Sequence, residues 1–170
     1  AEEAKFRQLV VNSVMSTDIF DKDLKQLRND RWDRAFGKNT ETDVTRAIDR
    51  KATIVIEHLI QASDVAHTMQ HWTVYCRWNE RLYVEMYQAY LDGRSDKDPT
   101  DSWYDGEIWF FDNYIIPLAK RLKECGVYLG VSGDEYLDFA TKNRKEWEKK
   151  GRTIVADMKD RAPTTKTAGR

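Results

Sequence analysis

One acidic side chain and two histidines lie close together in the middle of the chain. Asp64 follows a long apolar segment, and His67 and His71 come soon after it. If residues 64–71 formed a continuous helix, these side chains would share one face and could hold a metal ion, because carboxylate and imidazole are common metal ligands. The same spacing also fits a helix that ends at Asp64 and is followed by polar loop residues. The spacing alone therefore leaves both interpretations open.

A second group of candidate residues is aromatic. Tyr75 and Trp78 lie in a segment rich in aromatic side chains, and Phe110 lies in a strongly apolar one. A flat heteroaromatic ligand would stack on such rings, although aromatic residues at helical spacing more often pack in a core. Glu107 opens the apolar run that contains Phe110. It is either a ligand-binding carboxylate or a favourable acid in the first turn of a helix.

Long helices are expected to position these residues. The chain has only 8 Gly and 3 Pro in 170 residues, which favours an all-α fold, a compact multi-helix bundle. Asp21 is a candidate N-cap, Thr42 or Asp43 is expected to start the third helix, and Pro117 should kink the fifth. Apolar periodicity places helices at residues 2–16, 21–36, 43–63, 71–91, 103–124 and 134–150, the last ending at Gly151.

The third of these helices carries an apolar stripe that should face the core. His58, beside Glu57, is interpreted as a satisfied surface or boundary histidine. The stripe consists of Ile48, Ala52, Val55, Ile56, Leu59 and Ile60.

Composition excludes several classes of protein. The formal net charge of -1 provides no general attraction for nucleic acid, and no apolar run approaches the ~20 residues that span a bilayer. Glycine-rich nucleoside-triphosphate loops and the usual serine and zinc hydrolase motifs are absent from the sequence. We expect one domain at residues 1–151 and a polar, largely disordered tail at 152–170.

Three segments together resemble one family. They are residues 9–24, with the pair Thr17 and Asp18; residues 59–85, with Asp64, Tyr75 and Trp78; and residues 106–122, which end on a Pro-Leu pair. Their order and spacing are similar to the C-terminal half of a class I 3′,5′-cyclic-nucleotide phosphodiesterase catalytic domain, an HD-type fold. The resemblance runs from about residue 5 to residue 150, where Asn143, Arg144 and Trp147 fit the family's last helix.

The resemblance implies an activity and a set of roles. The family hydrolyses cyclic AMP or cyclic GMP to the 5′-monophosphate with two metals, usually zinc and magnesium, in cytoplasmic signal transduction. Asp64 matches the last metal ligand, and Phe110 matches the ring that clamps the purine. Glu107 stands where the family has its purine-binding glutamine, and His67 where an asparagine is usual. Tyr75 and Trp78 are expected beside the substrate.

The same resemblance implies that the fragment is incomplete. The family's other metal ligands and its general-acid histidine would precede Ala1, in an N-terminal half that is the expected partner, so no catalytic residue is assigned here. An ionised Glu107 has no donor and would favour guanine over adenine, and Trp109 could crowd the base. Two other interpretations stay open: a divergent, inactive regulatory homologue, and a helical interaction module without a pocket between Trp78 and Phe110.

Overall fold

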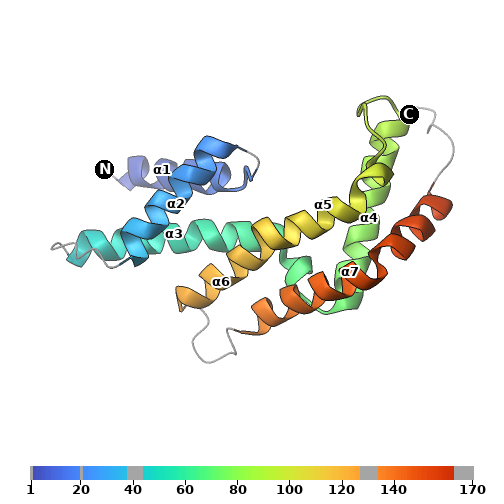
Figure 1. Cartoon of the computed structure of the whole chain (residues 1–170). Coiled ribbons are helices and arrows are strands. Elements are labelled where there is room, and N and C mark those ends of the chain that lie inside the picture. The colour runs from blue at the N-terminus through green and yellow to red at the C-terminus, as the bar shows by residue number, and fades with distance from the viewer. Residues whose placement is uncertain (1, 20, 38–43, 127–133, 163–170) are drawn as a thin grey trace. The chain divides into compact units, whose positions relative to one another are not determined.

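The computed structural model describes residues 2–19, 21–37, 44–126 and 134–162, and all regular structure in these ranges is helical (Figure 1). The predicted all-α fold is therefore confirmed. No helix in the described ranges is long and apolar enough to cross a membrane. The elements are α1 (Glu2–Ser16), α2 (Lys22–Phe36), α3 (Val44–Asp64), η1 (Ala66–Met69), α4 (Trp72–Leu91), η2 (Pro99–Asp101), α5 (Trp103–Phe110), the π-helical η3 (Phe111–Ile115), α6 (Ile116–Glu124) and α7 (Glu135–Arg161).

These elements divide into two compact units. Residues 1–66 and 118–134 form the first, and residues 67–117 and 135–170 form the second. The first unit contains α1, α2 and α3, whereas α4, α5, η3 and α7 belong to the second.

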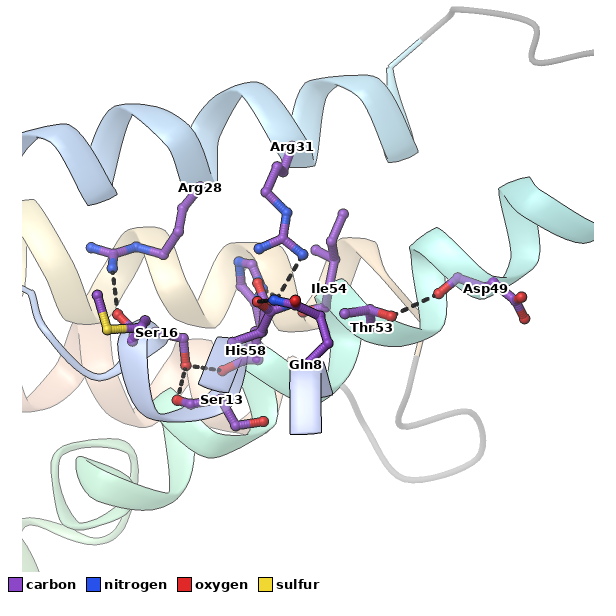
Figure 2. A network of polar contacts seen from close by, with 12 residues as sticks. Gln8, Ser13, Ser16, Arg28, Arg31, Asp49, Thr53, Ile54 and His58 are labelled. Atoms are coloured by element: carbon purple, nitrogen blue, oxygen red, sulfur yellow. Dashed lines mark hydrogen bonds and ion pairs between the residues drawn. The ribbon is translucent and has the colours of Figure 1, made fainter. Parts of the chain in front are cut away.

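In the first unit, hydrogen bonds attach α1 and α2 to their neighbours (Figure 2). Asp21 caps α2 as predicted, because its carboxylate accepts from the backbone amides of Asp23 and Leu24, both at 2.9 Å. Gln61 on α3 donates to the backbone oxygen of Ser16 at 2.7 Å, which satisfies the C-terminal end of α1. The predicted start of α3 at Thr42 or Asp43 lies outside the described residues.

The buried face of α3 differs from the predicted one. Ile54, Glu57, His58 and Gln61 are the side chains that α1 and α2 cover, and each is at most 4% exposed. The predicted apolar stripe is wrong as a core face, because Ile48, Ile56 and Ile60 are 61%, 36% and 38% exposed. The physical reason is that the covered face of α3 combines Ile54 with polar side chains that have partners, and does not use the other isoleucines of the helix. Arg31 on α2 lies 2.8 Å from Glu57, and Gln61 bonds to Ser16.

His58 belongs to this buried face and not to the surface that the sequence suggested. Its Nδ1 lies 2.8 Å from the backbone oxygen of Ile54, and its ring lies 4.9 Å from the ring of Trp32. Desolvation by burial lowers the pKa of His58 to about 4, so the imidazole is neutral and donates from Nδ1. The predicted satisfied histidine is confirmed in its hydrogen bond but not in its exposure.

The second unit is built around aromatic side chains. Tyr75 on α4 is fully buried and meets the ring of Phe111 at 5.3 Å and that of Trp147 at 5.8 Å, both edge-on. Asn143 on α7 donates to the backbone oxygens of Thr68 and Gln70 at 2.9 and 2.7 Å. These bonds fasten the chain just before α4 to α7.

Two predicted helix features need correction. The expected single helix over 103–124 contains a π-helical turn, η3, immediately before Pro117. A π-turn shifts the hydrogen-bond register, which accommodates the donor that proline lacks.

The predicted helix end at Gly151 is wrong, because α7 continues to Arg161 and makes residues 152–161 helical. A Cβ at Gly151 would lie 2.8 Å from the Trp147 ring, so glycine allows a close approach there and is not a cap. Residues 163–170 lie outside the described ranges.

Candidate functional site

A chain of hydrogen bonds in the second unit ends on the carboxylate of Glu107. The Trp103 indole donates to Asn79 Oδ1 at 3.2 Å, and Asn79 Nδ2 donates to the Tyr75 hydroxyl at 3.4 Å. Tyr75 in turn donates to Glu107 Oε2 at 2.7 Å. Tyr75 and Asn79 are four residues apart on α4, so both face α5, which carries Trp103 and Glu107. Because each hydrogen bond in this series is donated toward Glu107, its Oε2 atom is the final acceptor.

Burial determines the protonation state of the Glu107 carboxyl group. Desolvation raises the pKa of Glu107 to about 7, although the hydrogen bonds from Tyr75 and Asn79 act in the opposite direction. Desolvation together with the adjacent Glu107 carboxylate raises the pKa of Tyr75 well above its ordinary value, so the phenol keeps its proton. Near neutral pH Glu107 is therefore divided between an acceptor-only carboxylate and a carboxylic acid with one O–H donor.

The predicted aromatic residues occupy two places in this unit. Phe110 is partly buried and stacks on Tyr114 with ring centroids 5.4 Å apart, one helical turn after Glu107. The neighbouring Trp109 is 49% exposed. His67 and Trp78 contact each other through tilted rings 6.5 Å apart, and burial lowers the pKa of His67. The structure thus brings Glu107 together with Tyr75, and His67 together with Trp78.

Asp64, the predicted metal ligand, ends α3 in the first unit and is exposed. The continuous helix through His71 that could have gathered a three-ligand site is not formed, since η1 interrupts it at Ala66 and α4 begins anew. His71 instead caps α4, with its Nδ1 accepting from the Thr73 amide at 3.3 Å. Within the described ranges no three His, Cys, Asp or Glu side chains converge on a metal position. One exposed carboxylate does not fit a metal centre by itself.

Sequence reasoning missed two members of the hydrogen-bond chain, Asn79 and Trp103. A signal was present, because Asn79 lies four residues after Tyr75, on the same side of an aromatic-rich helix. A polar residue on a buried face is informative, since it must find a hydrogen-bond partner there. Trp103 gave no such signal, because its partner comes from 24 residues earlier in the chain.

Comparisons with known proteins give one match. A family model described as 3′5′-cyclic nucleotide phosphodiesterase matches residues 1–127 of the 170-residue chain. This range includes Asp64, Glu107 and Phe110, whereas the whole of α7 lies beyond it. Neither the search of curated proteins nor the search of solved structures found a significant match.

Proposed function

The chain belongs to the 3′5′-cyclic nucleotide phosphodiesterase family, and we propose on that premise that it forms the purine-binding part of a catalytic domain that hydrolyses cyclic AMP or cyclic GMP to the 5′-monophosphate. The observation that carries the proposal is the Glu107 carboxyl group held by Tyr75 at 2.7 Å. By the resemblance, Glu107 would occupy the position where the family binds the purine, and the candidate clamp Phe110 lies one helical turn after it on α5. A hydrogen-bonded, partly buried carboxyl group next to an aromatic ring suits the edge and the face of a purine.

The protonation state of Glu107 would select the purine. The ionised form accepts hydrogen bonds and suits the N1–H and amino donors of guanine. The protonated form can donate through one oxygen while the other accepts, which is the pattern of the glutamine that it replaces. With a pKa of about 7, Glu107 would favour cyclic GMP above neutral pH and lose that preference below it.

Asp64 is proposed as a single metal ligand in the complete domain. Because no metal cluster forms in the described ranges, ligands from elsewhere would have to complete the site. Zinc and magnesium are the metals that the resemblance implies, and they would supply and activate the attacking hydroxide. This chain alone is therefore expected to bind a nucleotide weakly and not to hydrolyse it.

The exposed apolar side chains of the first unit support the proposal that another protein surface binds there. On α1, Phe6, Val10 and Val14 lie one turn apart and are 67%, 44% and 64% exposed. A surface of this kind is typical of an interaction face. We assign it to the remainder of a phosphodiesterase catalytic domain, supplied by the same or another polypeptide. The same exposed face favours the second candidate function, a non-catalytic helical module that binds and regulates such a domain.

The test is saturation-transfer NMR on the 170-residue chain with cyclic GMP and cyclic AMP, a method that detects millimolar binding. Purine protons should receive saturation, and Phe110→Ala and Glu107→Ala should each abolish the transfer. Tyr136→Phe, a change on α7 away from both residues in sequence, is the matched control and should leave it intact. Transfer that survives both substitutions, or that never reaches the purine, would contradict the proposal. Hydrolysis of either nucleotide by the chain alone would contradict the expected inactivity.

A further inference from the structure

The hydrogen-bond chain that ends on Glu107 begins at a group that can only donate. The indole N–H of Trp103 has no lone pair to offer, so its partner at 3.2 Å must be the oxygen of the Asn79 amide. The amide nitrogen of Asn79 then points to the Tyr75 hydroxyl, 3.4 Å away. Because that hydroxyl accepts from Asn79, its own proton is directed to Glu107. Trp103 therefore sets the direction of every bond in the chain.

Burial keeps this direction from reversing. Asn79 and Tyr75 are 2% and 0% exposed, so water has little access to replace a lost partner on either side chain. The Trp103 ring is itself packed edge-on against Tyr83, with ring centroids 5.2 Å apart. The order of donors and acceptors is therefore determined by packing as well as by the donor-only indole.

The direction of the chain distinguishes the two oxygens of Glu107. Oε2 accepts from Tyr75 at 2.7 Å, so a proton on the carboxyl group is better placed on Oε1. Oε1 is then the oxygen that changes from acceptor to donor when Glu107 takes up a proton. The hydrogen bonds from Tyr75 and Asn79 favour the ionised form, against the desolvation that raises the pKa of Glu107 to about 7.

Tyr75 is the titratable side chain that donates to Glu107, and charged groups on the surrounding elements are engaged elsewhere. On η2, the Asp98 carboxylate accepts from the Thr100 amide at 2.8 Å. The remaining charged groups form ion pairs with one another: Asp105 of α5 with Arg152 of α7, Asp112 of η3 and Glu148 of α7 with Arg144 of α7, and Glu80 of α4 with Arg161 of α7. The protonation of Glu107 is therefore governed by burial and by the hydrogen-bond chain.

We propose that Trp103 and Asn79 are positioning residues, which direct the Tyr75 proton to Glu107 and thereby determine which purine the site prefers. The inference rests on the proposed function only in its last step, from Glu107 to the purine. Without the Trp103 donor, the Asn79 amide is free to rotate so that its oxygen accepts from Tyr75. Glu107 would then lose hydrogen bonds that stabilise its ionised form and would be protonated more often near neutral pH. That change would weaken a preference for guanine.

The first test is carbon-13 NMR of the glutamate carboxyl groups of the 170-residue chain, with the Glu107 signal identified by its loss in Glu107→Gln. In Trp103→Phe, which keeps an aromatic ring, and in Asn79→Leu, the midpoint of the Glu107 titration should rise by roughly 0.5–1 pH unit, the contribution of one hydrogen bond. The double variant should rise no further than the larger single change, because both substitutions break the same chain. Asn113→Leu is the matched control. It removes an exposed amide that donates to the backbone oxygen of Trp109 at 2.9 Å, and it should leave the midpoint unchanged.

The second test compares saturation transfer to cyclic GMP and to cyclic AMP at pH 7. The higher midpoint would lower the ionised fraction of Glu107 from about a half to between about a quarter and a tenth. The ratio of the cyclic GMP signal to the cyclic AMP signal should therefore fall by about two- to fivefold in Trp103→Phe and stay unchanged in Asn113→Leu.

The two tests separate the positioning role from the proposed function. Unchanged Glu107 midpoints in both single variants, or additive shifts in the double variant, would overturn the inference whether or not a nucleotide binds. Shifted midpoints with an unchanged nucleotide ratio would overturn the step from Glu107 to purine choice. Shifted midpoints in a chain whose parent form transfers no saturation to a purine would support the positioning role and contradict the proposed function instead.

Discussion

Replacement of Glu107 by glutamine should change how the stability of the second unit depends on pH. Burial raises the pKa of this carboxyl group to about 7 from an ordinary value of 4.5. At a pH between these values the folded protein keeps a proton that the unfolded chain has lost. The folded state therefore binds more protons in this window, and the free energy of unfolding falls as the pH rises through it.

The size of the effect follows from the two pKa values. At about 1.36 kcal/mol for each pKa unit, the ionised Glu107 costs the folded state about 3 kcal/mol above neutral pH, and nothing below about pH 4.5. Glutamine cannot ionise, and its carbonyl oxygen can still accept from Tyr75. We expect Glu107→Gln to match the parent protein near pH 5 and to be more stable by up to about 3 kcal/mol near pH 8.

Urea unfolding followed by tryptophan fluorescence is the suitable assay. Five of the six tryptophans belong to the second unit and only Trp32 belongs to the first, so the signal reports mainly on the unit that contains Glu107. Glu85→Gln, which neutralises an exposed carboxylate on α4, is the matched control and should shift stability equally at both pH values. If Glu107→Gln also changes stability equally at both values, or is less stable at the higher pH, the reasoning about burial is refuted.

Three further substitutions test the packing. Gly151→Ala should destabilise the chain by about 1–3 kcal/mol in thermal unfolding, because the new methyl group would lie 2.8 Å from the ring of Trp147; a gain in stability would contradict the close approach. Arg31→Met should cost about 3 kcal/mol in urea unfolding by leaving Glu57 buried and unpaired, and the double change with Glu57→Met should recover most of it; no recovery would refute the pairing. His58→Gln should reduce the fall in the free energy of unfolding between about pH 6.5 and 4, because the unfolded histidine binds a proton there and the buried one does not. Unfolding followed by circular dichroism at several pH values measures this, and an unchanged pH dependence would place the acid sensitivity elsewhere.

The sequence contained enough information for the helices but not for every face that they bury. Asp21 indicates the start of α2 in the sequence itself, because a capping side chain acts within three residues of its own position. Gly151 misled for the opposite reason. A glycine at the end of a periodic segment resembles a helix stop. The actual role of Gly151 is to leave room for the ring of Trp147, which lies against it only in the folded helix.

The candidate site was predictable in part. Glu107 is recognisable in the sequence as a charge in an apolar run, and the family resemblance implies a role for it. The neighbouring sequence does not indicate which residue donates a hydrogen bond to it. Tyr75 is 32 residues away, and the bond between them exists only because α4 and α5 pack together. The protonation of Glu107 depends on this burial, so it could not be inferred before the fold was known.

The two faces of α3 bear on whether this chain acts alone. The face that α1 and α2 cover contains Glu57, whose burial is unfavourable unless Arg31 offsets it. The opposite face leaves Ile48, Ile56 and Ile60 in contact with water, at about 25 cal/mol for each Å² of apolar surface that stays uncovered. A solitary helical domain would gain by the reverse arrangement, with isoleucine inside and glutamate outside. Covering Ile48, Ile56 and Ile60 with a partner surface would therefore stabilise the protein, whereas the polar face is already covered by α1 and α2.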